Sequence, residues 1–289
     1  MRPKTVGLIA NTGKRGAPDL VRLIRAQFEE RGVRVLFETS TAELVDESPS
    51  HECQELARKS DLLVVLGGDG TILNAIAMLG DEMKPIFGIN IGSLGFLTCA
   101  ASSWEREAVE QIVAGNLEFS ERALLDVQLD PHGPVTHQVS RCLNDAVFSR
   151  GEISRLIRLM VRVNGETLTE FNADGLIIAT PTGSTAYSLS AGGPILAPDS
   201  GCLVITPICP HTLTNRSIIL DDSAVIEVEA SERDYPVFLT LDGRAPVHIE
   251  AGSVVTVRKA PKVLPLAALP GVSFFSVVRQ KLKWSGSNV

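Results

Sequence analysis

The stretch that decides the fold is Leu62-Leu63-Val64-Val65-Leu66, followed directly by Gly67-Gly68-Asp69-Gly70-Thr71. Five consecutive apolar residues are typical of a strand that is covered on both faces, as in a parallel sheet. Glycines after such a strand let the backbone turn sharply, and a helix is predicted from about Thr71 to Met78. The free N–H groups and the positive dipole end of that helix favour a bound phosphate.

The same alternation of strand and helix extends to both sides of this segment. Further strands are predicted at residues 6–10, 33–37 and 86–89. Helices are predicted at 18–31, at 50–59, and from a capping-box pattern at Ser102 to Gly115. This alternation predicts a doubly wound α/β domain over residues 1–118.

Beyond residue 118 the apolar pattern changes to a period of two, which is typical of strands with one buried face. Asn164-Gly165 and Asp242-Gly243 are signals for hairpin turns. We therefore predict an antiparallel β domain over residues 119–261, arranged as a sandwich. A helix is predicted at 274–284, and periodicity does not assign it to either domain. The predicted strands lie at 125–130, 157–163, 203–206, 225–229, 237–241 and 253–257.

Composition restricts the class of partner. The net charge of −7 argues against a protein that wraps duplex nucleic acid. It leaves nucleotide binding open, because a few local N–H groups and cations can hold phosphate. The five cysteines are odd in number and form no C-x-x-C pair, so we expect reduced thiols in a cytoplasmic protein. No apolar window of ~18 residues and no signal-peptide pattern occur, so no membrane contact is expected.

Asp69 distinguishes the glycine-rich loop from a simple anion site. A carboxylate repels phosphate, but in a phosphotransferase it can accept the proton of the attacking hydroxyl or help hold a divalent metal. The alternative is that Gly67, Gly68 and Gly70 are turn residues only, and their spacing alone leaves this open. The sequence contains no G-x-x-x-x-G-K-[ST] phosphate loop.

A second run, residues 174–194, joins an apolar strand to a cluster of hydroxyls and glycines. Such a surface suits ribose hydroxyls and phosphates. The alternative is a polar loop without a ligand. Tyr187 can either stack on a base or pack against the protein. The hydroxyl groups come from Thr182, Ser184, Thr185, Ser188 and Ser190.

Other candidates are isolated along the chain. Asn144-Asp145 interrupts an apolar stretch and offers an amide and a carboxylate for a ribose diol, although a surface turn fits equally. Arg155 can neutralise a phosphate or simply be solvated. His211 fits a structural role in a loop better than catalysis. No residue grouping has zinc spacing, and no G-x-S-x-G elbow is present.

Taken together, these segments resemble the bacterial NAD kinase family over nearly the whole chain. The 67–71 motif is shared with diacylglycerol and sphingosine kinases, whereas the 180–194 motif is close to diagnostic for NAD kinases. Smaller matches are Asn144-Asp145 and the segments 88–90, 92–97, 207–211 and 277–284.

The resemblance implies transfer of the γ-phosphate of ATP, with a divalent metal ion, to the 2′-hydroxyl of the adenosine ribose of NAD. It places the active site in a cleft between the two domains, with Asp69 as the proton acceptor. It also implies that residues of about 262–289 return to the α/β domain, and that the protein is a homodimer or homotetramer. The phosphate-donor loop would be Gly67, Gly68, Gly70 and Thr71. The substrate-binding residues would be Asp69, Gly70, Asn144, Asp145, Arg155, Asn172, Asp174, Thr182, Thr185, Ala186, Tyr187, Ser188, Leu189, Ser190 and Arg244.

Two positions depart from the family pattern. Arg244 stands where many relatives carry Gln, and an arginine there can add a phosphate contact. Asn172 stands where some relatives carry a basic residue, which removes a charged contact. Two alternatives to an NAD kinase are a lipid kinase that uses the same first loop and a sensor that binds NADP(H) without turnover.

Overall fold

The computed structural model describes residues 1–92, 95–130, 138–151, 155–212, 214–231 and 235–284. The chain divides into two compact units: unit 1 is Met1–Glu121 with Leu264–Val289, and unit 2 is Arg122–Val263. The division predicted from the sequence was 1–118 with about 262–289, and 119–261. Each unit is described separately below.

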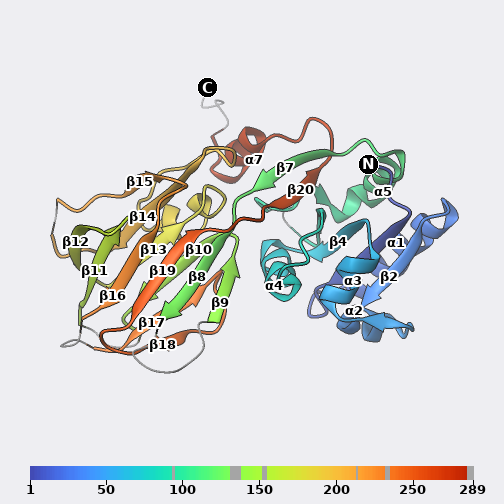
Figure 1. Ribbon diagram of the computed structural model, residues 1–289. Coiled ribbons are helices and arrows are strands. Elements are labelled where there is room, and N and C mark those ends of the chain that lie inside the picture. Colours follow the sequence, from blue (N-terminus) through green and yellow to red (C-terminus); the bar gives the residue numbers. More distant parts are fainter. Residues whose placement is uncertain (93–94, 131–137, 152–154, 213, 232–234, 285–289) are drawn as a thin grey trace. The chain divides into compact units, whose positions relative to one another are not determined.

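Unit 1 is an α/β unit built on one eight-stranded sheet (Figure 1). Its strand order is β3-β2-β1-β4-β5-β20-β7, and β6 pairs with β5. The pairs β1–β2, β1–β4, β4–β5 and β5–β20 are all parallel. The elements are β1 (Thr5–Ala10), α1 (Ala17–Glu30), β2 (Arg34–Glu38), α2 (Thr39–Val45), β3 (Ser50–His51), α3 (Cys53–Lys59), β4 (Leu62–Gly67), α4 (Asp69–Leu79), β5 (Ile86–Asn90), β6 (Ala100–Ala101), η1 (Ser102–Trp104), α5 (Glu105–Ala114), β7 (Glu118–Arg122), β20 (Leu264–Ala268) and α7 (Phe274–Lys281).

Helices cover both faces of this sheet. On one face, Val64 of β4 lies in a buried cluster with Ile24 of α1 and Val109 of α5. On the other face, Gly7 of β1 lies so close to Leu56 of α3 that an added Cβ would overlap its side chain. A sheet covered on both faces explains why every position of β4 is buried and apolar or glycine. The prediction of a doubly wound α/β domain is confirmed.

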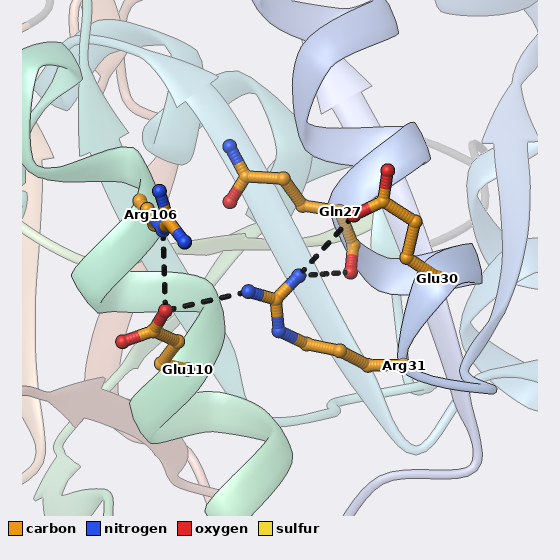
Figure 2. A network of polar contacts seen from close by, with 5 residues as sticks. All are labelled: Gln27, Glu30, Arg31, Arg106 and Glu110. Carbon is orange, nitrogen blue, oxygen red and sulfur yellow. Dashed lines mark hydrogen bonds and ion pairs between the residues drawn. The ribbon is translucent and has the colours of Figure 1, made fainter.

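Polar side chains join α1 and α5 at the surface of unit 1 (Figure 2). Arg31 donates to the carbonyl of Gln27 over 2.8 Å and to Glu110 over 3.3 Å. Glu110 also accepts from Arg106 over 3.3 Å. This network lies outside the apolar contact between the two helices, so it adds to their packing without forming its core.

Three local details of unit 1 differ from the prediction. The helix predicted at 50–59 starts only at Cys53, because Ser50 and His51 pair with the end of β2 as a short strand. The capping box at Ser102 does not form: a single 3-10 turn precedes α5, and no side chain caps either element. The helix after the glycine-rich segment starts at Asp69 rather than Thr71, because Gly68 takes the N-cap position.

Unit 2 consists of two six-stranded antiparallel sheets, with strand orders β15-β14-β13-β10-β17-β18 and β12-β11-β16-β19-β8-β9 (Figure 1). Side chains of both sheets, such as Phe148 and Val255, share one buried core. The predicted sandwich is confirmed. Its elements are β8 (Leu125–Asp130), β9 (Gln138–Cys142), β10 (Asp145–Ser149), β11 (Ile157–Val163), β12 (Glu166–Ala173), β13 (Gly175–Ala179), η2 (Gly183–Thr185), α6 (Tyr187–Ser190), β14 (Cys202–Ile208), β15 (Ile218–Asp221), β16 (Ile226–Ala230), β17 (Val237–Leu241), β18 (Val247–Ile249) and β19 (Val254–Lys259).

Both predicted hairpin turns form. Asn164 and Gly165 have positive φ angles of 54° and 80° and connect β11 to β12. Asp242 and Gly243 have φ angles of 50° and 69° and follow β17. Two successive left-handed residues suit the twist of an antiparallel pair, which is why Asn-Gly and Asp-Gly serve there.

All five cysteines are free, and Cys53, Cys99 and Cys142 are buried. Along the described parts of the chain, no helix combines the length and apolar character that a membrane crossing requires.

Candidate functional site

The first candidate site is the junction of β4 and α4 in unit 1. Gly67 ends the strand and Gly68 is the N-cap, so Asp69 and Gly70 form the first turn of the helix. The hydroxyl of Thr71 accepts from the N–H of Gly68 and from the side-chain amide of Asn11, each over 3.3 Å. A Cβ at Gly67 would overlap the Thr71 side chain, so glycine is required there.

The carboxylate of Asp69 is held by backbone donors. One oxygen accepts from the N–H of Phe96 over 2.8 Å, and the other accepts from the N–H of Leu97 over 3.0 Å. A Cβ at Gly95 would overlap this carboxylate, so glycine permits the close approach. Thr98 closes the loop by accepting from the N–H of Gly95 over 2.8 Å.

These groups gather where parallel strands end. Asn11 follows β1, Gly67–Thr71 follows β4, and Asn90 ends β5 and donates to Thr98 over 3.2 Å. In doubly wound folds, ligands bind beyond the carboxyl ends of the strands. Gly70 is exposed and has open space beside it. The site therefore offers free N–H groups of a helix start, with a fixed carboxylate beside them.

The second candidate site, in unit 2, is organised by Asp242. Its carboxylate accepts the N–H groups of Leu143 and Asn144, each over 2.7 Å, and that of Asp145 over 3.1 Å. Asp145 opens β10 opposite Ala179 and is only 4% exposed. The sequence left open that Asn144-Asp145 is a surface turn. This interpretation is wrong for Asp145, which is a buried strand residue.

The two carboxyl groups differ in their electrostatic surroundings. Burial raises the pKa of Asp242, while its three N–H donors and Arg244 oppose that rise. Burial and the neighbouring charge of Asp242 raise the pKa of Asp145 to about 7, although the backbone N–H of Tyr187 lowers it. The three N–H donors and Arg244 favour the charged form of Asp242 more than the single Tyr187 donor favours the charged form of Asp145.

The hydroxyl-rich motif packs directly against Asn144. Thr180 donates its hydroxyl to the carbonyl of Leu143 over 2.6 Å and accepts from the N–H of Gly183 over 3.1 Å. A Cβ at Gly183 would overlap the carbonyl of Asn144. The motif forms the short helices η2 and α6 rather than an irregular loop. The fold thus brings Asn144, Asp145 and the start of the motif together.

The hydroxyls of this motif fall into different groups. Ser184 and Ser188 are used inside the protein, since Ser184 donates to Pro181 over 2.6 Å and Ser188 shares a hydrogen bond with Thr206 over 2.9 Å. Thr182 is 6% exposed, and its hydroxyl has no hydrogen-bond partner among the described residues. A buried hydroxyl without a partner is unfavourable unless a ligand or water satisfies it.

The remaining motif residues lie around these hydroxyls. Thr185 donates to the carbonyl of Thr182 over 3.1 Å, and Ala186 joins the two short helices. Leu189 and Ser190 end α6. Tyr187 is 48% exposed, so about half of its surface is covered by the protein and the rest is accessible to a ligand.

Three predicted residues lie elsewhere in unit 2. Asp174 accepts from Arg150 over 2.8 Å. The backbone carbonyl of Asn172 accepts from the N–H of His211 over 2.9 Å. Arg155 is exposed, and its guanidinium lies 5.2 Å from the ring centre of Tyr235 and donates to the tyrosine hydroxyl.

Arg244 binds its own unit. It donates to the carbonyl of Leu241 over 2.9 Å and to that of Arg141 over 2.6 Å. A phosphate contact would have to use its other N–H groups. Beside it, Val127, Leu129, Leu239 and Val247 contribute to a mainly apolar cavity of about 150 Å³.

Comparison with known proteins decides between the open alternatives. The family described as the ATP-NAD kinase N-terminal domain matches residues 6–117, and the ATP-NAD kinase C-terminal domain matches residues 143–269. The chain belongs to the ATP-NAD kinase family. Like the family, it is an enzyme that phosphorylates NAD with ATP. The lipid-kinase and sensor alternatives are thereby excluded.

Individual relatives cover the whole length of this family member. The NAD kinases of Syntrophotalea carbinolica and Geotalea daltonii are 42% and 41% identical to it, over 97% and 98% of the chain and 99% and 95% of their own. Yeast NADH kinase complexed with NADH superposes with a TM-score of 0.89 at 26% identity, covering 99% of this chain and 89% of its own. The Archaeoglobus fulgidus NAD kinase in complex with ATP has a TM-score of 0.75 at 26% identity, covering 98% of this chain and 100% of its own.

Sequence reasoning missed two residues that organise these sites in this NAD kinase family member. Asp242 was assigned only to a turn, although it binds the Leu143–Asp145 backbone. Thr98 was not singled out, although it holds the loop that fixes Asp69. Asp242 has no local signal, because its partners lie 97–99 positions away. Thr98 bonds Gly95 and Asn90, three and eight positions away, and no sequence motif marked this short contact.

Proposed function

We propose that the protein transfers the γ-phosphoryl group of ATP to the 2′-hydroxyl of the adenosine ribose of NAD, with Asp69 as the general base. The observation that carries this proposal is the fixed carboxylate of Asp69 at the start of α4, beside the Gly67–Thr71 segment. General base catalysis requires a carboxylate oriented toward the hydroxyl, and two backbone donors supply that orientation.

The contacts of Asp69 leave room for the substrate. A carboxylate has about four acceptor positions, and Phe96 and Leu97 use one on each oxygen. The remaining positions can accept the hydrogen of a ribose hydroxyl as it attacks phosphorus. Because bond formation to the nucleophile is limited early in phosphoryl transfer, a weakly basic carboxylate suffices.

The phosphate donor would lie at the start of α4, where Gly67, Gly68, Gly70 and Thr71 present backbone rather than bulky side chains. The described residues contain no group of three or more His, Cys, Asp and Glu side chains placed for a metal ion. We assign the divalent ion to the substrate, as the ATP–metal complex, because the ion neutralises the phosphate charge during transfer.

The acceptor would be bound by the second site. Asn144 and Asp145 offer an amide and a carboxylate for ribose, and the unsatisfied hydroxyl of Thr182 offers a further contact. Yeast NADH kinase, which binds NADH, and the archaeal NAD kinase, which binds ATP, support both kinds of substrate.

Substitution of Asp69 by Asn tests the base. We expect kcat to fall by about 10²–10⁴ with smaller changes in the KM values for NAD and ATP. Asp61→Asn is a matched control, because the Asp61 carboxylate also accepts two backbone N–H groups in unit 1, those of Lys4 and Thr5 over 2.8 and 3.0 Å. A folded Asp69→Asn protein with the turnover of the control would disprove the assignment.

A homodimeric or homotetrameric assembly in the cytoplasm also belongs to the proposal, and rests on the resemblance to bacterial NAD kinases. Sedimentation velocity of the purified protein gives the assembly directly. A single species with the monomer mass of 31.0 kDa at assay concentrations would disprove the proposed assembly.

A further inference from the structure

The Asp242 carboxylate accepts three backbone hydrogen bonds near the acceptor site, and Asp242 is absent from the predicted substrate contacts. It lies 97–99 positions along the chain from the three residues whose N–H groups it accepts. The Asp242 N–H in turn donates to the carbonyl of Asp145 over 3.0 Å. The β17–β18 turn and the start of β10 are therefore tied together by four hydrogen bonds.

We propose that Asp242 is a positioning residue for NAD: its carboxylate holds the Asn144-Asp145 backbone so that both side chains meet the ribose, and its negative charge makes NAD binding weaken on acidification. The inference rests on the proposed contact of Asp145 with NAD. It goes beyond that contact because it states that Asp242, which does not touch the substrate, determines the position and the protonation of Asp145.

The geometry explains the positional part. One oxygen of Asp242 accepts from both Asn144 and Asp145, and the other accepts from Leu143. Three consecutive N–H groups that converge on one carboxylate fix the path of the backbone there. Asp145 is 4% exposed, so its carboxyl group cannot reach bulk water to escape the charge beside it.

The surrounding groups determine how the pair titrates. Arg244 lowers the pKa of Asp242, and so do the three N–H donors. Burial raises the pKa of the Cys142 thiol well above its ordinary value, so this neighbour is neutral. Asp126 is paired with Arg141 over 2.8 Å. Burial and the charge of Asp242 together raise the pKa of Asp145 to about 7.

Protonation turns one oxygen of Asp145 into a donor and removes the charge that strengthens its hydrogen bonds from ribose hydroxyls, so NAD affinity should fall as the pH drops through about 7. Removing the charge of Asp242 lowers the pKa of Asp145, and the loss of affinity then occurs at a lower pH. The inference therefore predicts that the loss of NAD affinity shifts to lower pH in the variant. A purely structural role of Asp242 would not produce this shift.

The experiment compares the KM for NAD and kcat across about pH 5.5 to 8.5 for the wild type, Asp145→Asn, Asp242→Asn and the double variant. In Asp242→Asn we expect KM to rise about tenfold or more, and its acid-side increase to move down by about half a pH unit or more. The double variant should show no acid-side increase, as in Asp145→Asn alone. Asp222→Asn, which removes a carboxylate paired with Lys259 in unit 2, is the control and should retain the wild-type profile.

A folded Asp242→Asn protein with the wild-type KM profile would overturn the inference. If that variant does not fold, calorimetry on the wild type still decides. NAD binding near pH 6.5 must release protons, detected by titration in buffers of different ionisation enthalpy, and Asp145→Asn must abolish the release. Absence of release would also overturn the inference. An Asp145→Asn protein with unchanged NAD affinity at every pH would instead disprove the proposed contact itself.

Discussion

Asp69 in unit 1 and Asp145 in unit 2 are both proposed to act on NAD, and their surroundings differ. Asp69 is partly exposed, and each of its oxygens accepts a backbone N–H. Asp145 is buried. The backbone N–H groups of Asp145 and of the two residues before it donate to the Asp242 carboxylate, not to that of Asp145. Donors orient the first carboxylate, whereas burial and a like charge raise the pKa of the second. The same residue type is thus prepared for proton transfer in one place and for pH-dependent binding in the other.

Of the substitutions that test this difference between Asp69 and Asp145, Gly95→Ala should have the largest effect. In Gly95→Ala, the new Cβ would overlap the Asp69 carboxylate and displace it from Phe96 and Leu97. We expect kcat to fall about a hundredfold or more, because small misplacements of a reacting group have such effects. Steady-state kinetics at saturating NAD and ATP measure the loss.

Gly201→Ala is the control for this change. Gly201 lies in unit 2, and the nearest atom to its added Cβ, on Asp222, is 3.7 Å away. It should retain normal turnover. Equal kcat values for both alanine variants would show that the position of the Asp69 carboxylate does not limit the reaction.

Asp145→Asn should change stability in a pH-dependent way. Below about pH 4 the carboxyl group is protonated in both the folded and the unfolded state. As the pH rises toward 7, the unfolded chain loses the proton while the folded protein keeps it, so the wild type loses stability. The variant lacks this loss. The free energy of unfolding of the variant should therefore rise relative to that of the wild type by on the order of 4 kcal/mol between pH 4 and pH 8.

Urea unfolding at both pH values measures this gain. A stability difference between wild type and variant that stays the same at pH 4 and pH 8 would show that Asp145 is not held at a raised pKa. The expected trade is that the variant is more stable above neutral pH but binds NAD less well.

A smaller effect is expected at Arg150, which donates to Asp174 over 2.8 Å while both side chains are about one-third exposed. In Arg150→Gln the Asp174 carboxylate loses this orientation, and the KM for NAD should rise about three- to tenfold. Arg162→Gln is the matched control, because Arg162 and Glu229 form an equally short pair with 34% and 33% exposure in the same unit. If the two variants give the same KM, orientation of Asp174 does not contribute to NAD binding.

The sequence predicted the parts of the fold that depend on neighbours along the chain. The apolar run 62–66 predicted β4, and Asn164-Gly165 predicted a hairpin, because each acts locally. The strand at Ser50 could not be predicted, since only its pairing with β2 makes it a strand.

The candidate sites follow the same division. Asp69 stands out in the sequence because a carboxylate is unusual among phosphate-loop glycines. Asp242 reads as an ordinary turn residue, since its hydrogen bonds reach residues almost a hundred positions away. The pKa of Asp145 was equally invisible, because burial and a neighbouring charge are properties of the folded chain.

The smallest effect is expected where a carboxylate lies in water. Glu110 accepts from Arg31 and Arg106, as Asp69 accepts from two donors, but it is 51% exposed (Figure 2). Solvent screens such contacts, and Arg31 keeps its bond to the Gln27 carbonyl when Glu110 is replaced by Gln. The free energy of unfolding should change by less than about 1 kcal/mol, and kcat should not change. A loss above about 2 kcal/mol in urea unfolding would place this pair outside the range of exposed ion pairs. The difference between these carboxylates could then not be explained by how deeply each one is buried.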